Sequence, residues 1–273
     1  MKLALFGLHR NDSATDPDVL VRQARLAEDA GIESLWVGDH ILLPPGEGDQ
    51  PRLEVVAVLT YLAAVTSRVR LAAGVFVLPQ RQPVLLAKQL TSLDVLSRGR
   101  LIIGIGAGYV EDELSALGVT LAERGPRTDE YLAAMRALWS STDFDGKFVS
   151  FTGGIQRPIP VQQPHPPIVV GGESPSAVRR AVQQGNGWYG WTLDPAETSK
   201  ALANLRSAAS RYDRPAALGD LEITITPRDP LTVDLVRQYA DLGVHRLVVQ
   251  PTDKTSATME KLIASTGDLV DRL

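Results

Sequence analysis

Apolar runs rich in β-branched residues alternate with segments of helical periodicity along the whole chain of 273 residues. The helical segments carry apolar residues three and four positions apart, as at Leu20, Ala24 and Ala27. Parallel strands need crossover connections, usually helices, and eight such repeats can close into a barrel without edges. We therefore expect an α/β protein of the (β/α)8 TIM barrel type, although a doubly wound open sheet shows the same alternation. The expected strands span residues 3–8, 33–37, 69–77, 100–105, 167–171, 187–192, 221–226 and 245–250.

Helix starts are marked by a capping side chain followed by proline, which suits the first helical position. Glu197 lies three residues after one of these caps and completes a capping-box pattern. These signals support the order of strand and helix independently of hydrophobicity. The pairs are Asp16-Pro17, Ser174-Pro175, Asp194-Pro195 and Asp229-Pro230.

One segment, residues 141–166, interrupts the alternation. It holds a hairpin-like stretch at residues 147–151 and is rich in proline towards its end. A connection of this length inside a compact domain usually covers a site or an interface. We expect a single domain over residues 1–273, with residues 141–166 forming an inserted lid between strands four and five.

Five of the strand-like runs end in glycine mixed with polar or aromatic residues. Glycine allows close approach of the backbone to a ligand, so its recurrence at equivalent strand ends indicates one shared pocket. The endings are Gly38-Asp39-His40, Gly74-Val75-Phe76, Gly106-Ala107-Gly108-Tyr109, Gly171-Gly172-Glu173-Ser174 and Gly187-Trp188-Tyr189.

Charge and composition narrow the class of ligand. The formal net charge is −4 and no basic run occurs, so we expect a small-molecule substrate and no nucleic-acid partner. The absence of cysteine excludes disulfides, thiolate metal sites and cysteine nucleophiles. Neither HExxH nor GxxxxGK is present, and we expect no metal site.

No run of 18 apolar residues occurs, and Met1 leads directly into a strand-like segment. The start lacks the basic residues and long apolar stretch of a secretory signal. We therefore expect a cytoplasmic protein with no membrane partner.

Several segments taken in order resemble one known family. They are Ala30-Gly31, residues 34–40, 74–79, 81–89, 93–100 and 104–109, Gly171-Gly172 and residues 185–188. In this order they resemble the bacterial luciferase-like superfamily of flavin and deazaflavin oxidoreductases, especially the branch that uses coenzyme F420. The resemblance covers nearly the whole chain and implies a luciferase-like barrel, commonly a homodimer. It also implies a cofactor ring at the carboxyl ends of the strands and hydride transfer through that cofactor.

The resemblance places Asp39 and His40 at the polar edge or reactive centre of the ring, with His40 as a proton donor or orienting group. The structural alternative is that Asp39 caps a loop and His40 packs against it. At Gly74 and Val75 the resemblance implies a bulge behind the ring, with a non-prolyl cis peptide bond between these two residues. The alternative there is an ordinary strand glycine that permits close packing.

The run Gly104-Ile105-Gly106-Ala107-Gly108 departs from a dinucleotide-binding GxGxxG motif, because Tyr109 occupies the last glycine position. We interpret these glycines as making room for a flat ring. The family often places an acid at the position of Tyr109, so a sugar-phosphate dehydrogenase activity is in doubt. Residues 111–113, all acidic, are interpreted as helix-start acids.

The run Gly171-Gly172-Glu173-Ser174 opens a helix and could hold a phosphate on its free N–H groups. The alternative is a tight turn with Ser174 as an N-cap. Ser176 occupies the final glycine position of GxSxG, so a serine nucleophile is discarded. Strand alternation sends Trp188 and Trp191 to opposite faces, so at least one of them should be structural. We interpret these aromatic residues as packing in the barrel, and the alternative is that Trp188 lines the pocket.

Together these features predict an F420-dependent oxidoreductase acting on an unidentified small organic substrate. The alternatives are an FMN-dependent luciferase-like monooxygenase, or a flavin- or deazaflavin-binding protein without turnover. His9, just past the first strand, is a further candidate for substrate contact. The candidate catalytic residue is His40, and the candidate cofactor-binding residues are Asp39, His40, Gly74, Val75, Gly106, Ala107, Gly108, Tyr109, Gly171, Gly172, Glu173 and Ser174.

Overall fold

Parallel strands close into a barrel in the computed structural model, which describes residues 1–43, 50–253 and 255–273. The strands are β1 (Lys2–Phe6), β2 (Ser34–Val37), β3 (Arg70–Ala73) continued by β4 (Phe76–Val77), β5 (Leu101–Gly106), β8 (Ile168–Gly171), β9 (Gly187–Leu193), β10 (Glu222–Pro227) and β11 (Arg246–Val249). Their order is β3-β2-β1-β11-β10-β9-β8-β5-β4, and β3 also pairs with β5. That pairing, with Leu71 opposite Leu101, closes the sheet. The (β/α)8 prediction is confirmed and the open sheet is excluded.

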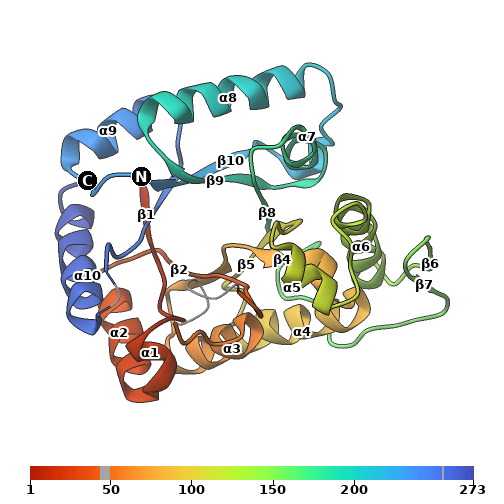
Figure 1. Ribbon diagram of the computed structural model, residues 1–273, viewed down its shortest axis with the longest axis horizontal. Helices are drawn as coiled ribbons and strands as arrows, with labels where there is room; N and C mark the ends of the chain where they lie inside the picture. The colour runs from red at the N-terminus through yellow and green to blue at the C-terminus, as the bar shows by residue number, and fades with distance from the viewer. Residues whose placement is uncertain (44–49, 254) are drawn as a thin grey trace.

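Helices form a ring around the strands (Figure 1). They are α1 (Asp12–Thr15), α2 (Pro17–Asp29), α3 (Val55–Val65), α4 (Pro83–Leu96), α5 (Glu111–Ala116), α6 (Arg124–Trp139), α7 (Pro175–Gln184), α8 (Pro195–Ala209), α9 (Val233–Asp241) and α10 (Ser256–Val270). Short 3-10 turns lie at Leu78–Gln80 and Ala216–Leu218. In the described part of the chain, no helix is long and apolar enough to cross a membrane.

Three of the four expected helix starts are confirmed. Asp16, Ser174 and Asp194 each accept a hydrogen bond from a first-turn backbone N–H, and Asp194 forms the expected capping box with Glu197. The fourth, at Asp229, is wrong. Helix α9 begins later, at Val233, because Thr232 is the residue whose side chain accepts from the helix.

Strand alternation separates two apolar layers. Alternate residues point into the barrel and form a small inner cluster, whereas their neighbours along each strand point outward to the helices. On β1, for example, Ala4 and Phe6 belong to the inner cluster, and Leu3 and Leu5 to the outer one. The inner cluster consists of Ala4, Phe6, Trp36, Ala72, Ile102, Val169, Tyr189 and Val248.

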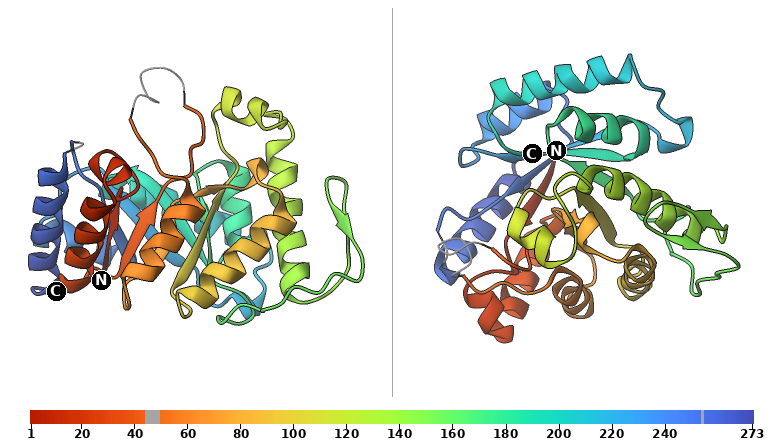
Figure 2. Two further views of the ribbon diagram at one scale, coloured as in Figure 1. Left: turned by 90° about the horizontal axis from the view of Figure 1, so that it is seen from below. Right: turned by 45° about the vertical axis from the view of Figure 1, so that its right-hand side comes forward.

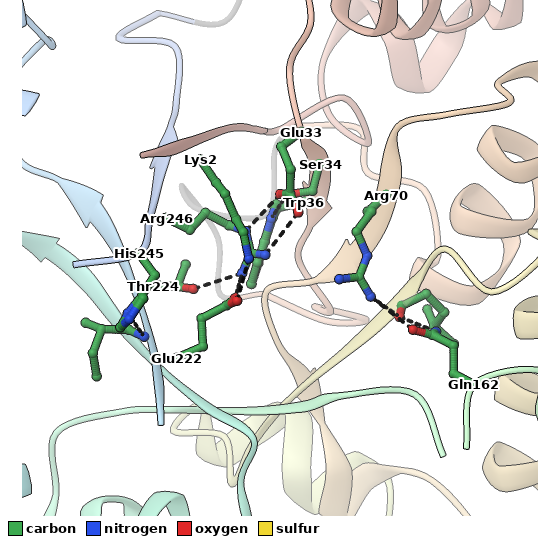
Figure 3. A network of polar contacts seen from close by, with 12 residues as sticks. Lys2, Glu33, Ser34, Trp36, Arg70, Gln162, Glu222, Thr224, His245 and Arg246 are labelled. Carbon is green, nitrogen blue, oxygen red and sulfur yellow. Dashed lines mark hydrogen bonds and ion pairs between the residues drawn. The ribbon is translucent and has the colours of Figure 1, made fainter. Parts of the chain in front are cut away.

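A polar network closes the amino-terminal end of the barrel beneath Trp36 (Figure 3). Arg246 is buried there, and its guanidinium donates to both carboxylate oxygens of Glu33, at 2.9 and 3.1 Å. It also pairs with Glu222 and lies 5.7 Å from the centre of the Trp36 ring. Arg246 is thus shared between the carboxylates of Glu33 and Glu222, and these three side chains fill this end of the barrel. Lys2 adds a further contact to Glu222, at 2.6 Å.

The inserted segment, residues 141–166, lies outside the barrel. Its two short strands, β6 (Phe144–Asp145) and β7 (Ser150–Phe151), form a hairpin that extends to one side (Figure 2). Its later part packs on α4, where buried Asp94 accepts from the N–H groups of Val161 and Gln162 at 2.7 and 3.0 Å. The Gln162 side chain also accepts from Arg70, which begins β3 (Figure 3). The insertion is therefore present, but it braces the amino-terminal side of the barrel, and the expectation of a lid is wrong for this arrangement.

Candidate functional site

A cavity of about 660 Å³ opens at the carboxyl ends of the strands. Barrel enzymes generally keep their chemistry at this end, and ligand pockets are of this size. All twelve residues expected at the site contribute to its wall: Asp39, His40, Gly74, Val75, Gly106, Ala107, Gly108, Tyr109, Gly171, Gly172, Glu173 and Ser174. The structure thus brings the predicted residues together, while their contact with a cofactor stays a prediction.

The floor of the cavity is the bulge between β3 and β4. The peptide bond between Gly74 and Val75 is cis, as expected. A Cβ atom built on Gly106 would lie 2.7 Å from Val75 Cγ2, and one on Gly171 would lie 2.9 Å from Val75 Cγ1. Likewise, a Cβ on Gly108 would lie 2.5 Å from a methyl of Val77. The interpretation of these glycines is corrected: they make room for the valines of the bulge, and Val75 in turn lines the cavity.

Asp39 lines the cavity, but its carboxylate is committed to protein partners. The side chain is 1% exposed and accepts from Arg81 Nε at 2.8 Å and from the Val77 N–H at 3.0 Å. The second carboxylate oxygen pairs with the same guanidinium. Asp39 therefore ties the end of β2 to the strand after the bulge, which matches the structural alternative for its side chain.

His40 lies beside a carboxylate that the sequence interpretation overlooked. Its Nδ1 is 3.1 Å from Glu113 Oε2, and its ring is 20% exposed. Glu113 Oε1 accepts from the backbone N–H groups of Ile41 and Leu42. Burial pushes the pKa of Glu113 upward, but the hydrogen bonds from His40 and from these N–H groups outweigh it, and the pKa lies below its ordinary value. An ionised Glu113 favours a proton on His40 Nδ1 and leaves Nε2 as the other functional nitrogen.

Glu113 lies in the first turn of α5, as expected for a helix-start acid, but its carboxylate also contacts His40, which the sequence interpretation did not include. Glu111 and Asp112 are exposed, whereas Glu113 is buried with Leu114 on the inner side of α5. The helical position of Glu113 next to a buried leucine is the signal that could have identified it. Tyr109 is 69% exposed, and its ring centre lies 5.7 Å from that of His40.

Aromatic rings form a second part of the wall. Phe6, Tyr189 and Trp191 line the cavity, and the Phe6 and Trp191 ring centres are 5.0 Å apart. Trp188 is fully buried on the outward face of β9 and donates from Nε1 to the Gly172 carbonyl at 2.8 Å. The two tryptophans do lie on opposite faces, but Trp191 is the one that reaches the cavity.

The start of α7 forms the wall opposite β1. Ser174 accepts from the Ala177 N–H at 3.2 Å, so the N-cap interpretation is confirmed. The N–H groups in the first turn of a helix lack intrahelical acceptors, and here they border the cavity. Gly172 has φ of +106°, a conformation that glycine adopts readily.

Four arginines in the wall were also missed. Arg124 donates to the Gly108 carbonyl at 2.7 Å, and Arg180 pairs with Asp129 at 2.7 Å. Arg10 and Arg52 lie on the side of β1 and β2. Arg10 directly follows His9 at a strand end, and that position could have indicated it. Among the described residues, no group of three or more His, Cys, Asp or Glu could hold a metal ion.

Comparisons with known proteins agree with this architecture. The family described as luciferase-like monooxygenase matches residues 1–251. An uncharacterised protein of Mycobacterium tuberculosis is 33% identical over 265 residues, covering 88% of this chain and 91% of that protein. The oxygenase component of a flavin-dependent trigonelline monooxygenase from Acinetobacter baylyi is 33% identical over 200 residues, covering 71% of this chain and 54% of that protein.

Among solved structures, the coenzyme F420-dependent tetrahydromethanopterin reductase of Methanopyrus kandleri superposes with a TM-score of 0.77. The alignment covers 99% of this chain and 98% of the reductase, at 17% identity. At this level of identity, the likeness concerns the fold.

Proposed function

Because the chain belongs to the luciferase-like monooxygenase family, we propose that it is an oxidoreductase that transfers a hydride between coenzyme F420 and a small organic substrate. The observation that carries the proposal is His40, held by buried Glu113 at the wall of a cavity whose floor is Val75. His40, as a proton-transfer group, and Val75, as an apolar surface, then border the same cavity at the end of the barrel where barrel enzymes carry out catalysis.

The cavity suits a flat tricyclic group. Its volume of about 660 Å³ accommodates a ligand of that size, and Val75 offers an apolar surface for a ring face. The first turn of α7, with Gly172 and Ser174, would hold a phosphate on its N–H groups. Bound F420 would supply or accept the hydride, as cofactors carry such chemistry.

The contribution of the chain is orientation and proton handling. Glu113 fixes the His40 ring through Nδ1, so Nε2 can hold or deliver a proton on the side away from the carboxylate. The aromatic wall of Phe6, Tyr189 and Trp191 would exclude water from a bound substrate. We expect the protein to act as a homodimer in the cytoplasm; sedimentation of the purified protein tests the dimer.

A second candidate is an FMN-dependent monooxygenase. It is favoured by the 33% identity to the flavin-dependent monooxygenase of Acinetobacter baylyi. FMN and F420 share a flat tricyclic ring system and a phosphate, so the features described above suit both.

Cofactor titration separates the two candidates. Trp191 lines the cavity and is 41% exposed, so its fluorescence should respond to a bound ring. We expect F420 to quench the fluorescence with a dissociation constant in the micromolar range or below, ~8 kcal/mol or more of binding free energy, and FMN to leave it unchanged. Trp191→Phe should remove most of the signal change, while Trp188→Phe, on the outward face, should retain it. Binding of FMN without F420 would replace the proposal by the second candidate.

Turnover then tests the role of His40. Reduced F420 supplied with enones and imines should be oxidised at the same rate with or without oxygen. His40→Gln should lower kcat/KM about 100-fold with little change in F420 affinity, since a positioned acid contributes about that much. His165→Gln is the matched control, because His165 packs against Trp139 outside the cavity. If no substrate oxidises reduced F420 above background, the chain binds the cofactor without turnover.

A further inference from the structure

Two loops are joined at the rim of the cavity between β1 and β2. Arg10 and Arg52 form an antiparallel backbone bridge. On either side of it, the Leu53 N–H donates to the His9 carbonyl at 2.9 Å and the Asn11 N–H to the Pro51 carbonyl at 3.1 Å. Residues directly opposite in an antiparallel pair project to the same face. The pairing therefore sets two guanidinium groups side by side, and both residues line the cavity.

The charge of Arg10 has no carboxylate partner among the described residues, although it is largely enclosed. Its guanidinium lies 4.6 Å from the centre of the Phe6 ring. Burial and the neighbouring charge of Arg52 lower the pKa of Arg10 to about 10. Arg10 is still protonated at neutral pH. The positive charges of Arg10 and Arg52 therefore lie close together at a wall of the cavity that is largely shielded from water.

Among residues 1–43, 50–253 and 255–273, the carboxylates around Arg10 have other partners. Asp39 and Glu54 both pair with Arg81, Glu54 at 2.8 Å. Asp12 and Asp253 border a narrow crevice on the outer side of Arg10, away from the main cavity. Asp12 accepts from the Ser256 N–H at 2.9 Å, and the Asp253 carboxylate accepts from Thr255 and Thr258.

His9 lies beside Arg10 and Arg52. Its Nε2 accepts from the Gly38 N–H at 3.1 Å, which assigns the proton of the neutral ring to Nδ1. Nδ1 is buried and has no hydrogen-bond partner. Burial and the charges of Arg10 and Arg52 lower the pKa of His9 well below its usual value, so the ring is neutral. We call His9, Arg10 and Arg52 the basic corner; all three line one side of the cavity, and Arg10 contributes a cation without a carboxylate partner among the described residues.

We propose that the basic corner binds a carboxylate group of the substrate, and that the substrates of this enzyme are small organic carboxylates. A guanidinium group matches a carboxylate with two parallel hydrogen bonds. The apolar body of such a substrate would pack on Phe6 and Trp191, which adjoin the corner. This inference rests on the proposed function, because it names the substrate class of the same cavity.

The barrel geometry separates the two ligands. In the closed sheet, β1 and β8 lie four strands apart in either direction, so the basic corner faces the start of α7 across the cavity. A cofactor phosphate at α7 and a substrate carboxylate at the corner would occupy opposite ends. The reacting atoms of the two molecules would then meet between Val75 and His40.

Calorimetric titration with benzoate, and with benzamide as its neutral analogue, tests the inference on the protein with and without F420. We expect benzoate to bind at least tenfold more tightly than benzamide. Arg10→Met keeps the apolar stem over Phe6 and removes the charge, and it should abolish this preference. Arg10→Lys should retain part of it, because lysine keeps the charge but loses the planar fork.

Arg22→Met is the matched control, since Arg22 is an exposed arginine paired with Glu260 on α10. It should leave both affinities unchanged. Circular dichroism melting identifies any variant that fails to fold. If Arg10→Met fails to fold, the affinities of Arg10→Lys for benzoate and benzamide are compared with those of the wild type instead. Equal binding of the two probes, no binding of benzoate, or an unchanged preference in folded Arg10→Met would overturn the inference. If the wild-type protein prefers benzoate to benzamide but does not bind F420, the proposed function is overturned instead.

Discussion

The Glu113 carboxylate accepts hydrogen bonds from the His40 ring and from two backbone N–H groups at the end of β2. It is 2% exposed, so these contacts are made away from water. Such a contact fixes both the tautomer and the orientation of an imidazole. In the proposed function, Glu113 therefore acts through His40, as a positioning residue.

Replacing Glu113 by Gln should reduce kcat/KM about tenfold or more, because a neutral amide is a weaker acceptor for His40 Nδ1 than a carboxylate and orients the ring less firmly. The loss should fall on kcat, while KM and F420 affinity change little, and Glu113→Asp should restore part of it. Glu111→Gln, an exposed position on the same helix, should behave as the wild type. An unchanged kcat in folded Glu113→Gln would show that the contact is only structural.

Gly106 illustrates how one hydrogen atom allows the bulge. A Cβ at this position would lie 2.7 Å from Val75 Cγ2, so Gly106→Ala should destabilise the fold by about 1–3 kcal/mol. Val75→Ala removes the clashing methyl, and the double variant should lose less than the sum of the two single changes. Urea unfolding measures all three. Gly125→Ala, in α6 with no atom within 4 Å of the added Cβ, should cause no loss; strict additivity at Gly106 and Val75 would argue against the contact.

Single residues of the site could be predicted where a strand ends in glycine, since such positions share one end of a parallel barrel. The partner of each side chain could not. Asp39 and His40 look alike in the sequence, yet one is tied to Arg81 and the other to Glu113, 73 positions away. The contact between Gly106 and Val75 could not be predicted either, because it forms only when the barrel closes.

At the scale of elements, hydrophobic periodicity placed the strands within a few residues, because each strand is buried on both faces. Helix starts were placed wherever the capping side chain was also the residue before proline. At α9 these two signals separate, and Thr232 rather than Asp229 is the cap. The position of residues 141–166 depends on long-range contacts such as that of Asp94 with Val161, which no local pattern encodes.

The start of α9 gives a direct test of the corrected boundary. Thr232→Ala should lower the free energy of unfolding by about 1 kcal/mol, because the Leu235 N–H loses its acceptor. Asp229→Ala, three residues earlier and exposed, should change it little. Urea unfolding of the two variants decides; the reverse order of effects would restore the earlier start.

At the scale of the whole molecule, carboxylates at the amino-terminal end make stability depend on pH. Glu28, on α2, accepts from the N–H groups of Ser67, Arg68 and Val69, which lead into β3. Burial raises its pKa, but these hydrogen bonds outweigh it and lower the pKa to about 2 from an ordinary 4.5. Because the folded value is depressed, the stabilisation is complete above about pH 4.5 and is lost as the pH falls towards 2.

Glu28→Gln should therefore be less stable than the wild type at neutral pH, and the difference should shrink between pH 4.5 and 2. Urea unfolding at several pH values measures the difference. Ser265→Ala, at an exposed position of α10, removes no titratable group and should show a difference that does not vary with pH. A constant gap for Glu28→Gln would contradict the assigned role.

The barrel is closed at its amino-terminal end, where Arg246, Glu33 and Glu222 meet beneath Trp36 (Figure 3). Two molecules that bind in the cavity must therefore enter through the same opening, at the carboxyl ends of the strands. If the cofactor ring lies on Val75 and the substrate covers it, as proposed, we expect the cofactor to enter first and leave last. Steady-state kinetics of such an enzyme should therefore follow a compulsory sequence of arrivals and departures, which the architecture imposes before any chemistry takes place.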